Sequence, residues 1–109
     1  MPLPQAAFHI LVALADQDRH GYAIMRDVAS RTDGQLKLSP GTLYGSIKRL
    51  LEAGLILEIE EPRGQATDDE RRRYYRITKF GREVAQAEAD RLANLLRQAR
   101  AAGLVPRRV

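Results

Sequence analysis

A chain of 109 residues is long enough for one domain, or for one domain with an oligomerisation arm. It contains no cysteine, which excludes disulfides, thiolate nucleophiles and Cys-based metal sites, and two histidines are too few for a dedicated metal site. The net charge of +4 is mildly basic, no apolar run is long enough for a membrane span, and Met1 to Gln5 lacks the basic region of an export signal, so we expect a cytoplasmic protein without a cofactor.

Residues Gln5 to Gln17 predict a first helix that is apolar nearly all round. Its apolar residues fall on two faces, Phe8, Leu11, Val12 and Ala15 on one and Ile10 and Leu14 on the other. Such a helix must be covered on both sides. We expect one face to meet its own domain and the other to meet a second subunit, with Phe8, Ile10 and Leu14 in the dimer interface. The alternative is a helix that is central in a monomer.

His20 to Thr32 predicts a second helix, which Asp33 and Gly34 end. The connection that follows is short enough to turn the chain sharply into the next helix, which favours a helix-turn-helix pair. Leu36 and Leu38 are compatible with a short strand. His20 and Tyr22, at the start of the helix, suit contacts to a nucleic-acid backbone but equally suit packing or capping.

Ser39 to Gly54 predicts a third helix whose two ends are clearly marked. Ser39 can accept a hydrogen bond from a free backbone N–H at the helix start, and Pro40 suits the first helical position. Gly54 suits the left-handed position that ends a helix. The apolar residues recur at helical spacing and predict a core-facing stripe of Leu43, Ile47, Leu50 and Leu51.

The opposite face of this third helix is short, polar and mostly basic. It carries Gly41, Thr42, Gly45, Lys48, Arg49 and Glu52, with Tyr44 on its boundary. Glycine within a helix costs about 1 kcal/mol relative to alanine, and the core stripe does not require Gly45. We therefore expect something to approach the backbone closely at this position.

After Gly54 the pattern changes to that of a β-hairpin. Leu55 to Glu60 alternates apolar with acidic residues, and Arg72 to Ile77 is a second strand rich in Tyr and Arg. The residues between them, Glu61 to Arg71, predict a long loop. Across the ladder we expect ion pairs of Glu58 and Glu60 with Arg72 and Arg76, and we expect one residue of the pair Tyr74 and Tyr75 to face the core and the other the surface.

Thr78 is expected to cap a final helix from Lys79 to about Ala102. Apolar residues repeat at sevens along this helix and form a short seam with Ala85, Leu92, Leu95, Leu96 and Ala99, in which Glu88 also takes a place. We expect the helix to pack on the first helix and to mediate dimerisation. The fold class is mostly α with a small β-hairpin. The domains are a winged helix-turn-helix over residues 1–78, with its wing at about 55–77, a dimerisation helix over 79–103 and a disordered basic tail over 104–109.

Positive charge is concentrated around the third helix and the hairpin. Residues 62–83 hold seven basic and four acidic side chains, and residues 36–54 hold three basic and one acidic. Residues 1–35, by contrast, have a net charge of −1. This distribution favours a nucleic-acid partner.

Three segments together resemble the PadR family of transcriptional regulators. They are HGYAIMRDV at 20–28, SPGTLYGSIKRLLEAGLI at 39–56 and RRRYYRITKFG at 71–81, and the resemblance covers about residues 8–84. The end of the chain is similar to that of the small PadR subtype, in which a single C-terminal helix mediates dimerisation. The resemblance implies a dimeric winged helix-turn-helix protein that represses promoters and, in many members, releases DNA when a small molecule binds.

In this interpretation the third helix enters the major groove of duplex DNA. The candidate DNA contacts are Ser39, Gly41, Thr42, Tyr44, Gly45, Lys48, Arg49, Tyr22, Arg63, Arg71, Arg72 and Arg73. The acidic residues Asp68 to Glu70 would point to solvent. A small aromatic or hydrophobic effector would fit in a cavity between the first and last helices, where Phe8 could line it, although Phe8 and Phe80 are core residues by default.

Two other classes of function are weighed against DNA binding. An enzyme is disfavoured because no nucleophile, base and orienting group come together in the sequence. A winged helix that binds a protein needs no basic helix face, and its affinity would not fall steeply with salt as phosphate binding does.

Overall fold

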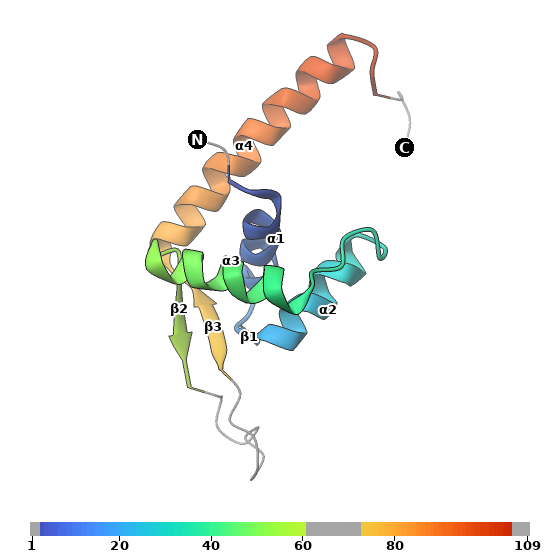
Figure 1. Ribbon diagram of the computed structural model, residues 1–109. Coiled ribbons are helices and arrows are strands. Elements are labelled where there is room, and N and C mark those ends of the chain that lie inside the picture. The colour runs from blue at the N-terminus through green and yellow to red at the C-terminus, as the bar shows by residue number, and fades with distance from the viewer. Residues whose placement is uncertain (1–2, 61–72, 106–109) are drawn as a thin grey trace.

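Four helices and three short strands make up residues 3–60 and 73–105, the part of the chain that the structure, a computed structural model, describes (Figure 1). The elements in chain order are α1 (Gln5–Leu14), β1 (Arg19–His20), α2 (Gly21–Arg31), α3 (Pro40–Glu52), β2 (Ile56–Ile59), β3 (Tyr74–Ile77) and α4 (Lys79–Ala101). The arrangement confirms the predicted winged helix-turn-helix with a long C-terminal helix. The first helix ends at Leu14, three residues earlier than predicted.

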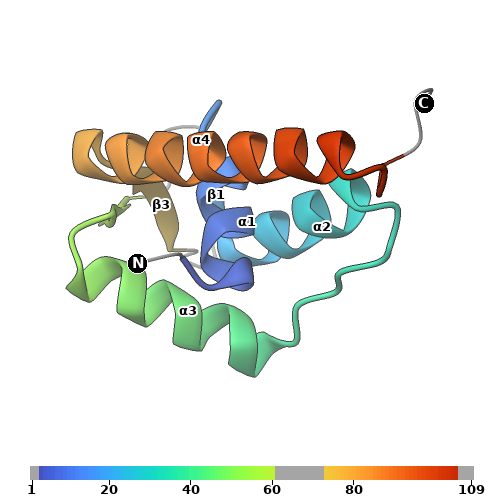
Figure 2. The same ribbon diagram turned by 90° about the horizontal axis from the view of Figure 1, so that it is seen from above.

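Helix α1 lies at the centre of the fold and contacts α2, α3, β3 and α4 (Figures 1 and 2). Ile10 and Leu14 are at most 1% exposed and pack in one cluster with Ile24 of α2 and Leu43 of α3. The prediction that Ile10 and Leu14 contribute to a dimer interface is therefore wrong, because their own chain covers them completely. Phe8, on the other face, is only half-buried.

The strands form a three-stranded antiparallel sheet in the order β1-β3-β2. Strand β1 was not predicted. Leu36 and Leu38, which the sequence left open as a short strand, belong to no strand, and their side chains pack on the hydrophobic core. Tyr74 and Tyr75 are both buried, so the expected division into one core and one surface residue is also wrong. The His20 ring, brought by β1, meets the Tyr74 ring edge-on with centroids 5.3 Å apart.

The ion pairs of the hairpin also differ from those expected. Arg76 lies opposite Leu57 in the ladder, and its Nη2 donates to Asp18 Oδ2 at 2.8 Å rather than to a glutamate of β2. Glu58 instead has Arg73 Nε at 3.9 Å from its Oε2, a long pair at the surface. The expected pairs of Arg72 lie outside the described residues.

Local hydrogen bonds fix both ends of α3 and the start of α4 as predicted. Ser39 Oγ accepts from the backbone N–H of Thr42 at 3.1 Å, and Gly54 takes the left-handed φ of 76° that follows the helix. Thr78 Oγ1 accepts from the N–H of Gly81 at 2.9 Å and donates to the carbonyl of Gly54 at 2.7 Å. The end of α3, the base of the hairpin and the start of α4 therefore share one junction.

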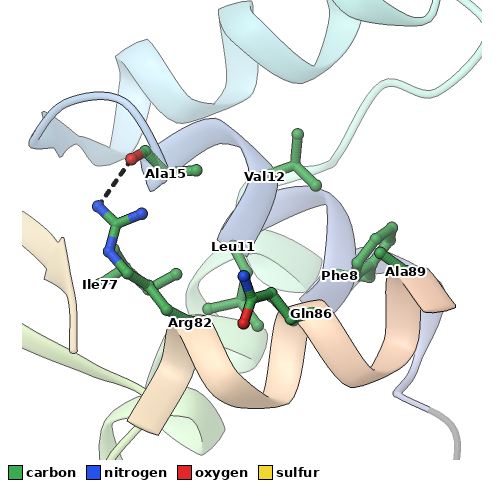
Figure 3. A pocket seen from close by; sticks show the side chains of 9 residues that line it. Phe8, Leu11, Val12, Ala15, Ile77, Arg82, Gln86 and Ala89 are labelled. Carbon is green, nitrogen blue, oxygen red and sulfur yellow. Dashed lines mark hydrogen bonds between the residues drawn. The ribbon is translucent and has the colours of Figure 1, made fainter. Parts of the chain in front are cut away.

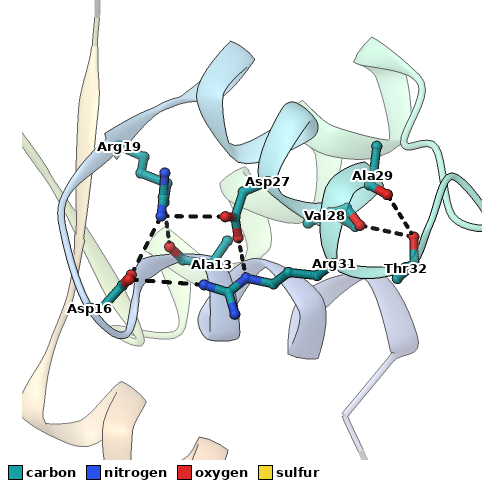
Figure 4. Close-up of polar contacts among 8 residues, drawn as sticks. All are labelled: Ala13, Asp16, Arg19, Asp27, Val28, Ala29, Arg31 and Thr32. Atoms are coloured by element: carbon teal, nitrogen blue, oxygen red, sulfur yellow. Dashed lines mark hydrogen bonds and ion pairs between the residues drawn. The ribbon is translucent and has the colours of Figure 1, made fainter.

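A network of charged side chains joins α1, β1 and α2 (Figure 4). Arg19 Nε donates to the carbonyl of Ala13 at 2.7 Å, and its Nη2 lies 3.4 Å from Asp27 and 3.5 Å from Asp16. Asp27 also accepts from Arg31 Nε at 2.6 Å, and this hydrogen bond raises the pKa of Arg31. Because Arg19 and Asp27 are largely buried, the network holds α2 in a fixed position against α1.

Helix α4 packs on α1 with its first half, and its second half extends away from the rest of the fold (Figure 1). Beyond Glu88 no residue of α4 is buried. Three leucines of this second half are between 37% and 52% exposed, namely Leu92, Leu95 and Leu96. Phe80 is 53% exposed, so its assignment to the core is wrong.

Candidate nucleic-acid interface

The outer face of α3 is open along its whole length. Ser39, Gly41, Thr42, Tyr44, Lys48 and Arg49 are exposed, and Gly45 is half-buried. Within the described residues, neither Lys48 nor Arg49 forms an ion pair with a carboxylate. The face therefore combines free positive charge with a backbone that few side chains cover.

The two glycines of this face leave real space above the helix. A Cβ placed on Gly41 would meet no heavy atom within 4 Å, and one on Gly45 would meet only Arg49 Nη1, at 3.9 Å. No described part of the chain makes the close approach that Gly45 led us to expect. The space is thus available to a partner outside the described chain.

Ser39 and Thr42 are partly occupied by the helix start itself. Ser39 Oγ accepts from the Thr42 N–H and also donates to Thr42 Oγ1 at 3.1 Å. Each hydroxyl keeps acceptor capacity, because an oxygen of this kind has two lone pairs. Their first role is to cap α3, and any contact with a partner is added to that role.

Tyr44 connects α3 to α2. Its ring lies directly over Gly21, where an added Cβ would come within 2.9 Å of Tyr44 Cζ and closer still to the hydroxyl. A larger residue at position 21 would therefore displace the Tyr44 ring from its present position. Tyr44 nevertheless remains 51% exposed, so part of the ring belongs to the open face.

The start of α2 adds exposed groups beside α3. Tyr22 is 59% exposed, and the guanidinium carbon of Arg26 lies 5.1 Å from the centre of its ring. His20 Nδ1 accepts from the backbone N–H of Ala23 at 3.2 Å, so His20 caps α2, one of the roles that the sequence left open. Arg26 was not among the residues predicted from the sequence, although it lies one helical turn after Tyr22.

The wing contributes one described candidate. Arg73 is exposed, and among the described residues it forms only the long pair with Glu58. The other predicted wing residues, Arg63, Arg71 and Arg72, lie outside the described residues, as do Asp68 to Glu70. Their role in binding stays a prediction.

A groove of about 230 Å³ lies between α1 and the first half of α4 (Figure 3). Phe8, Val12 and Ala85 line it with apolar surface, and at one end Arg82 Nη2 donates to the carbonyl of Ala15 at 2.8 Å. A second hollow beside it, of about 370 Å³, borders on the ion pair of Glu88 with Arg91. Arg91 donates to both carboxylate oxygens and so lowers the pKa of Glu88.

Residues 3–60 and 73–105 show neither a metal-binding cluster nor a membrane-spanning helix. They contain no group of three or more His, Cys, Asp or Glu side chains placed to hold a metal ion. None of their helices has the length and apolar character that crossing a membrane requires.

The helix-turn-helix of α2 and α3, the hairpin after it and the open basic face of α3 define a winged helix protein of the class that regulates transcription. The chain belongs to the PadR-like family of transcriptional regulators, whose family model matches residues 10–87. Members of this family are transcription regulators and not enzymes. The resemblance found in the sequence is thereby confirmed.

The curated relatives of the chain include one transcriptional regulator and two uncharacterised proteins. The chain is 33% identical over 90 residues to the transcriptional regulator Rv3488 of Mycobacterium tuberculosis, which covers 83% of this chain and 78% of the relative. It is 34% identical over 73 residues, or 67% of its length, to an uncharacterised protein of Lysinibacillus sphaericus. That match spans 64% of the Lysinibacillus protein. The chain is also 38% identical, over 79% of its length, to a 37.1 kDa transposon protein of Streptomyces fradiae, of which the match spans 22%.

Solved structures share the fold. A transcriptional regulator of Clostridium thermocellum superposes with a TM-score of 0.74 at 26% identity, covering 93% of this chain and 90% of its own. PadR of Bacillus subtilis, solved in complex with operator DNA, superposes with a TM-score of 0.64 at 21% identity, covering 84% of this chain and 48% of its own.

Proposed function

We propose that the protein is a homodimeric repressor that binds a pseudo-palindromic DNA operator with two copies of α3 and is released by a small molecule. The open outer face of α3 is the observation that carries the proposal. Free cations at Lys48 and Arg49 suit phosphates, and the uncovered backbone at Gly41 and Gly45 suits close approach to a major groove that admits one helix. The operator complex of the Bacillus subtilis relative supports this use of the fold.

Dimerisation would cover the free half of α4. Leu92, Leu95 and Leu96 expose apolar surface there, and Ala85 and Ala99 lie half-buried on the same helix. A helix of 23 residues is about 35 Å long, which gives room for a seam with a second copy. In such a dimer the two α3 helices would lie about 34 Å apart, one turn of DNA, and would read a pseudo-palindrome.

The effector would occupy the groove between α1 and α4. Its volume of about 230 Å³ is below the range of about 300–1,000 Å³ that is usual for small-molecule sites. A second copy packed on α4 beside Leu92 would add walls to the groove. The apolar lining at Phe8 and Val12 suits a small aromatic or hydrophobic molecule.

Selection of bound sequences from random duplexes with the purified protein tests DNA binding, symmetry and spacing together. We expect an enriched inverted repeat whose affinity falls steeply as salt rises. Arg49→Ala should weaken binding and reduce the salt dependence, whereas Arg100→Ala removes the same charge from the last turn of α4 and should change neither. Binding of a protein partner instead of DNA would give no enriched sequence and no such salt dependence.

Repression and release have separate tests. The selected repeat, placed across a promoter ahead of a reporter gene, should lower expression when the protein is present. A panel of small aromatic and hydrophobic molecules should contain one that displaces the labelled duplex and raises the melting temperature of the free protein. A panel without any displacement or stabilisation would contradict the effector proposal but not DNA binding.

A further inference from the structure

Arg26 differs from the other arginines of its surroundings in having no acidic partner. Arg19 and Arg31 both bind Asp27, whereas no described carboxylate forms an ion pair with Arg26. The guanidinium of Arg26 instead lies over the ring of Tyr22, with 5.1 Å between its carbon atom and the ring centre. Arg26 therefore presents a full positive charge to solvent from a restricted position.

The pair lies beside the open face of α3. Tyr22 directly follows Gly21, the residue that the ring of Tyr44 covers from α3. Tyr22 and Arg26 are four residues apart and share one face of α2, while Ile24 and Val28 of the same helix are buried in the core. The pair is thus an exposed extension of the surface that α3 presents.

The chemistry of the pair suits a phosphate. A guanidinium group has a planar set of donors that matches phosphate oxygens, and an aromatic face holds it in place without neutralising it. Restricting the side chain before binding reduces the entropy lost when it meets a ligand. In helix-turn-helix proteins the first helix of the pair crosses the DNA backbone, which places phosphates near α2.

We propose that Arg26, held against the ring of Tyr22, binds a backbone phosphate of the duplex at the edge of the groove that α3 enters. This inference rests on the proposed DNA binding. Arg26 would contact the phosphate directly, and Tyr22 would act as a positioning residue through its ring.

Salt titrations of binding test the phosphate contact. Arg26→Ala is compared with the wild-type protein by fluorescence anisotropy on the selected duplex and on a scrambled duplex of equal length. Loss of one phosphate contact should reduce the slope of log K against log salt by about 0.9. If the two proteins bind equally at about 1 M salt, this difference in slope corresponds to about an eight-fold loss of affinity at about 0.1 M salt. The same factor should apply to both duplexes, because phosphates carry no sequence information.

Matched variants separate charge, ring and fold. Arg26→Lys should keep the wild-type slope because it keeps the charge, and Tyr22→Phe should keep the affinity because it keeps the ring. Tyr22→Ala should weaken binding in the wild-type background but cause no further loss when combined with Arg26→Ala. Arg100→Ala controls for the general loss of one charge, and melting temperatures control for folding.

The possible failures are distinguishable. If the wild-type protein binds duplex with a steep salt dependence and Arg26→Ala is unchanged in slope and affinity, the phosphate contact is refuted and the proposed function stands. A further loss from Tyr22→Ala in the Arg26→Ala background would refute the positioning role. If the wild-type protein shows no salt-dependent binding to any duplex, both proposals are overturned.

Discussion

Replacing Gly45 with alanine should stabilise the fold and weaken DNA binding at the same time. Gly45 lies within α3, and an added Cβ would meet nothing nearer than Arg49 Nη1 at 3.9 Å, an ordinary contact. Alanine is better than glycine in a helix interior by about 1 kcal/mol. For a domain of this size such a gain raises the melting temperature by about 4–8 °C.

The same methyl group would stand in the space that we assign to the duplex. Adding a methyl to a well-packed contact costs about 1–3 kcal/mol. In a binding equilibrium that range corresponds to about a 5- to 150-fold loss of affinity. Thermal unfolding of Gly45→Ala measures the first effect, and anisotropy with the selected duplex measures the second.

Gly41→Ala is the matched second variant, because its Cβ would meet nothing within 4 Å and lies on the same face near the helix start. It should also reduce affinity without loss of stability. A Gly45→Ala protein that is more stable and still binds the duplex as tightly as the wild type would refute the idea that the glycine provides clearance for DNA.

Three further outcomes are expected. Gly81→Ala should lower the free energy of unfolding by about 1–3 kcal/mol in urea titrations, since its Cβ would collide with the carbonyl of Leu55 and lie 2.9 Å from Ile77 Cγ1; unchanged stability would contradict the tight junction. Leu92→Asp should give a monomer in sedimentation with its melting curve still cooperative, and a variant that still sediments as a dimer would rule out the proposed seam. The hydrogen bonds from Arg91 lower the pKa of Glu88, so ionised Glu88 stabilises the fold above about pH 4.3, the ordinary pKa of a glutamate. This contribution is lost as the pH falls through the lowered pKa. Melting temperatures of Glu88→Gln should therefore decline less than those of the wild type on acidification in that range, and parallel declines would show that the pair with Arg91 contributes nothing.

Sequence patterns predicted the elements whose signals are local. Helix α3 could be bounded from Ser39 and Gly54 because a cap and a left-handed glycine act on their immediate neighbours. The start of α4 at Thr78 was predicted for the same reason.

The features that the sequence did not predict depend on distant partners. Strand β1 has only two residues and exists through its pairing with Tyr74 and Tyr75, more than fifty positions later. Arg76 finds Asp18 across a similar separation. An apolar pattern shows that both sides of α1 are covered, but it does not show whether the cover comes from the same chain, and Ile10 was therefore misassigned.

One candidate residue could have been found from the sequence and was not. Arg26 follows Tyr22 by four positions, a spacing that places two side chains side by side on a helix. The net charge of −1 over residues 1–35 conceals Arg26, because three of the acidic residues in that range bind other arginines. Charge is better counted after the internal ion pairs are removed.

The junction at Gly81 has a consequence for how a signal would pass through the molecule. Leu55 and Gly81 meet without an intervening side chain, and Thr78 bonds to the end of α3, so there is no compressible layer between the two helices. We therefore expect helix α4 and the end of α3 to move together as one rigid unit. In the proposed dimer, a small change in the crossing angle of the two α4 helices would therefore shift both α3 helices relative to the DNA repeat. No element would have to refold.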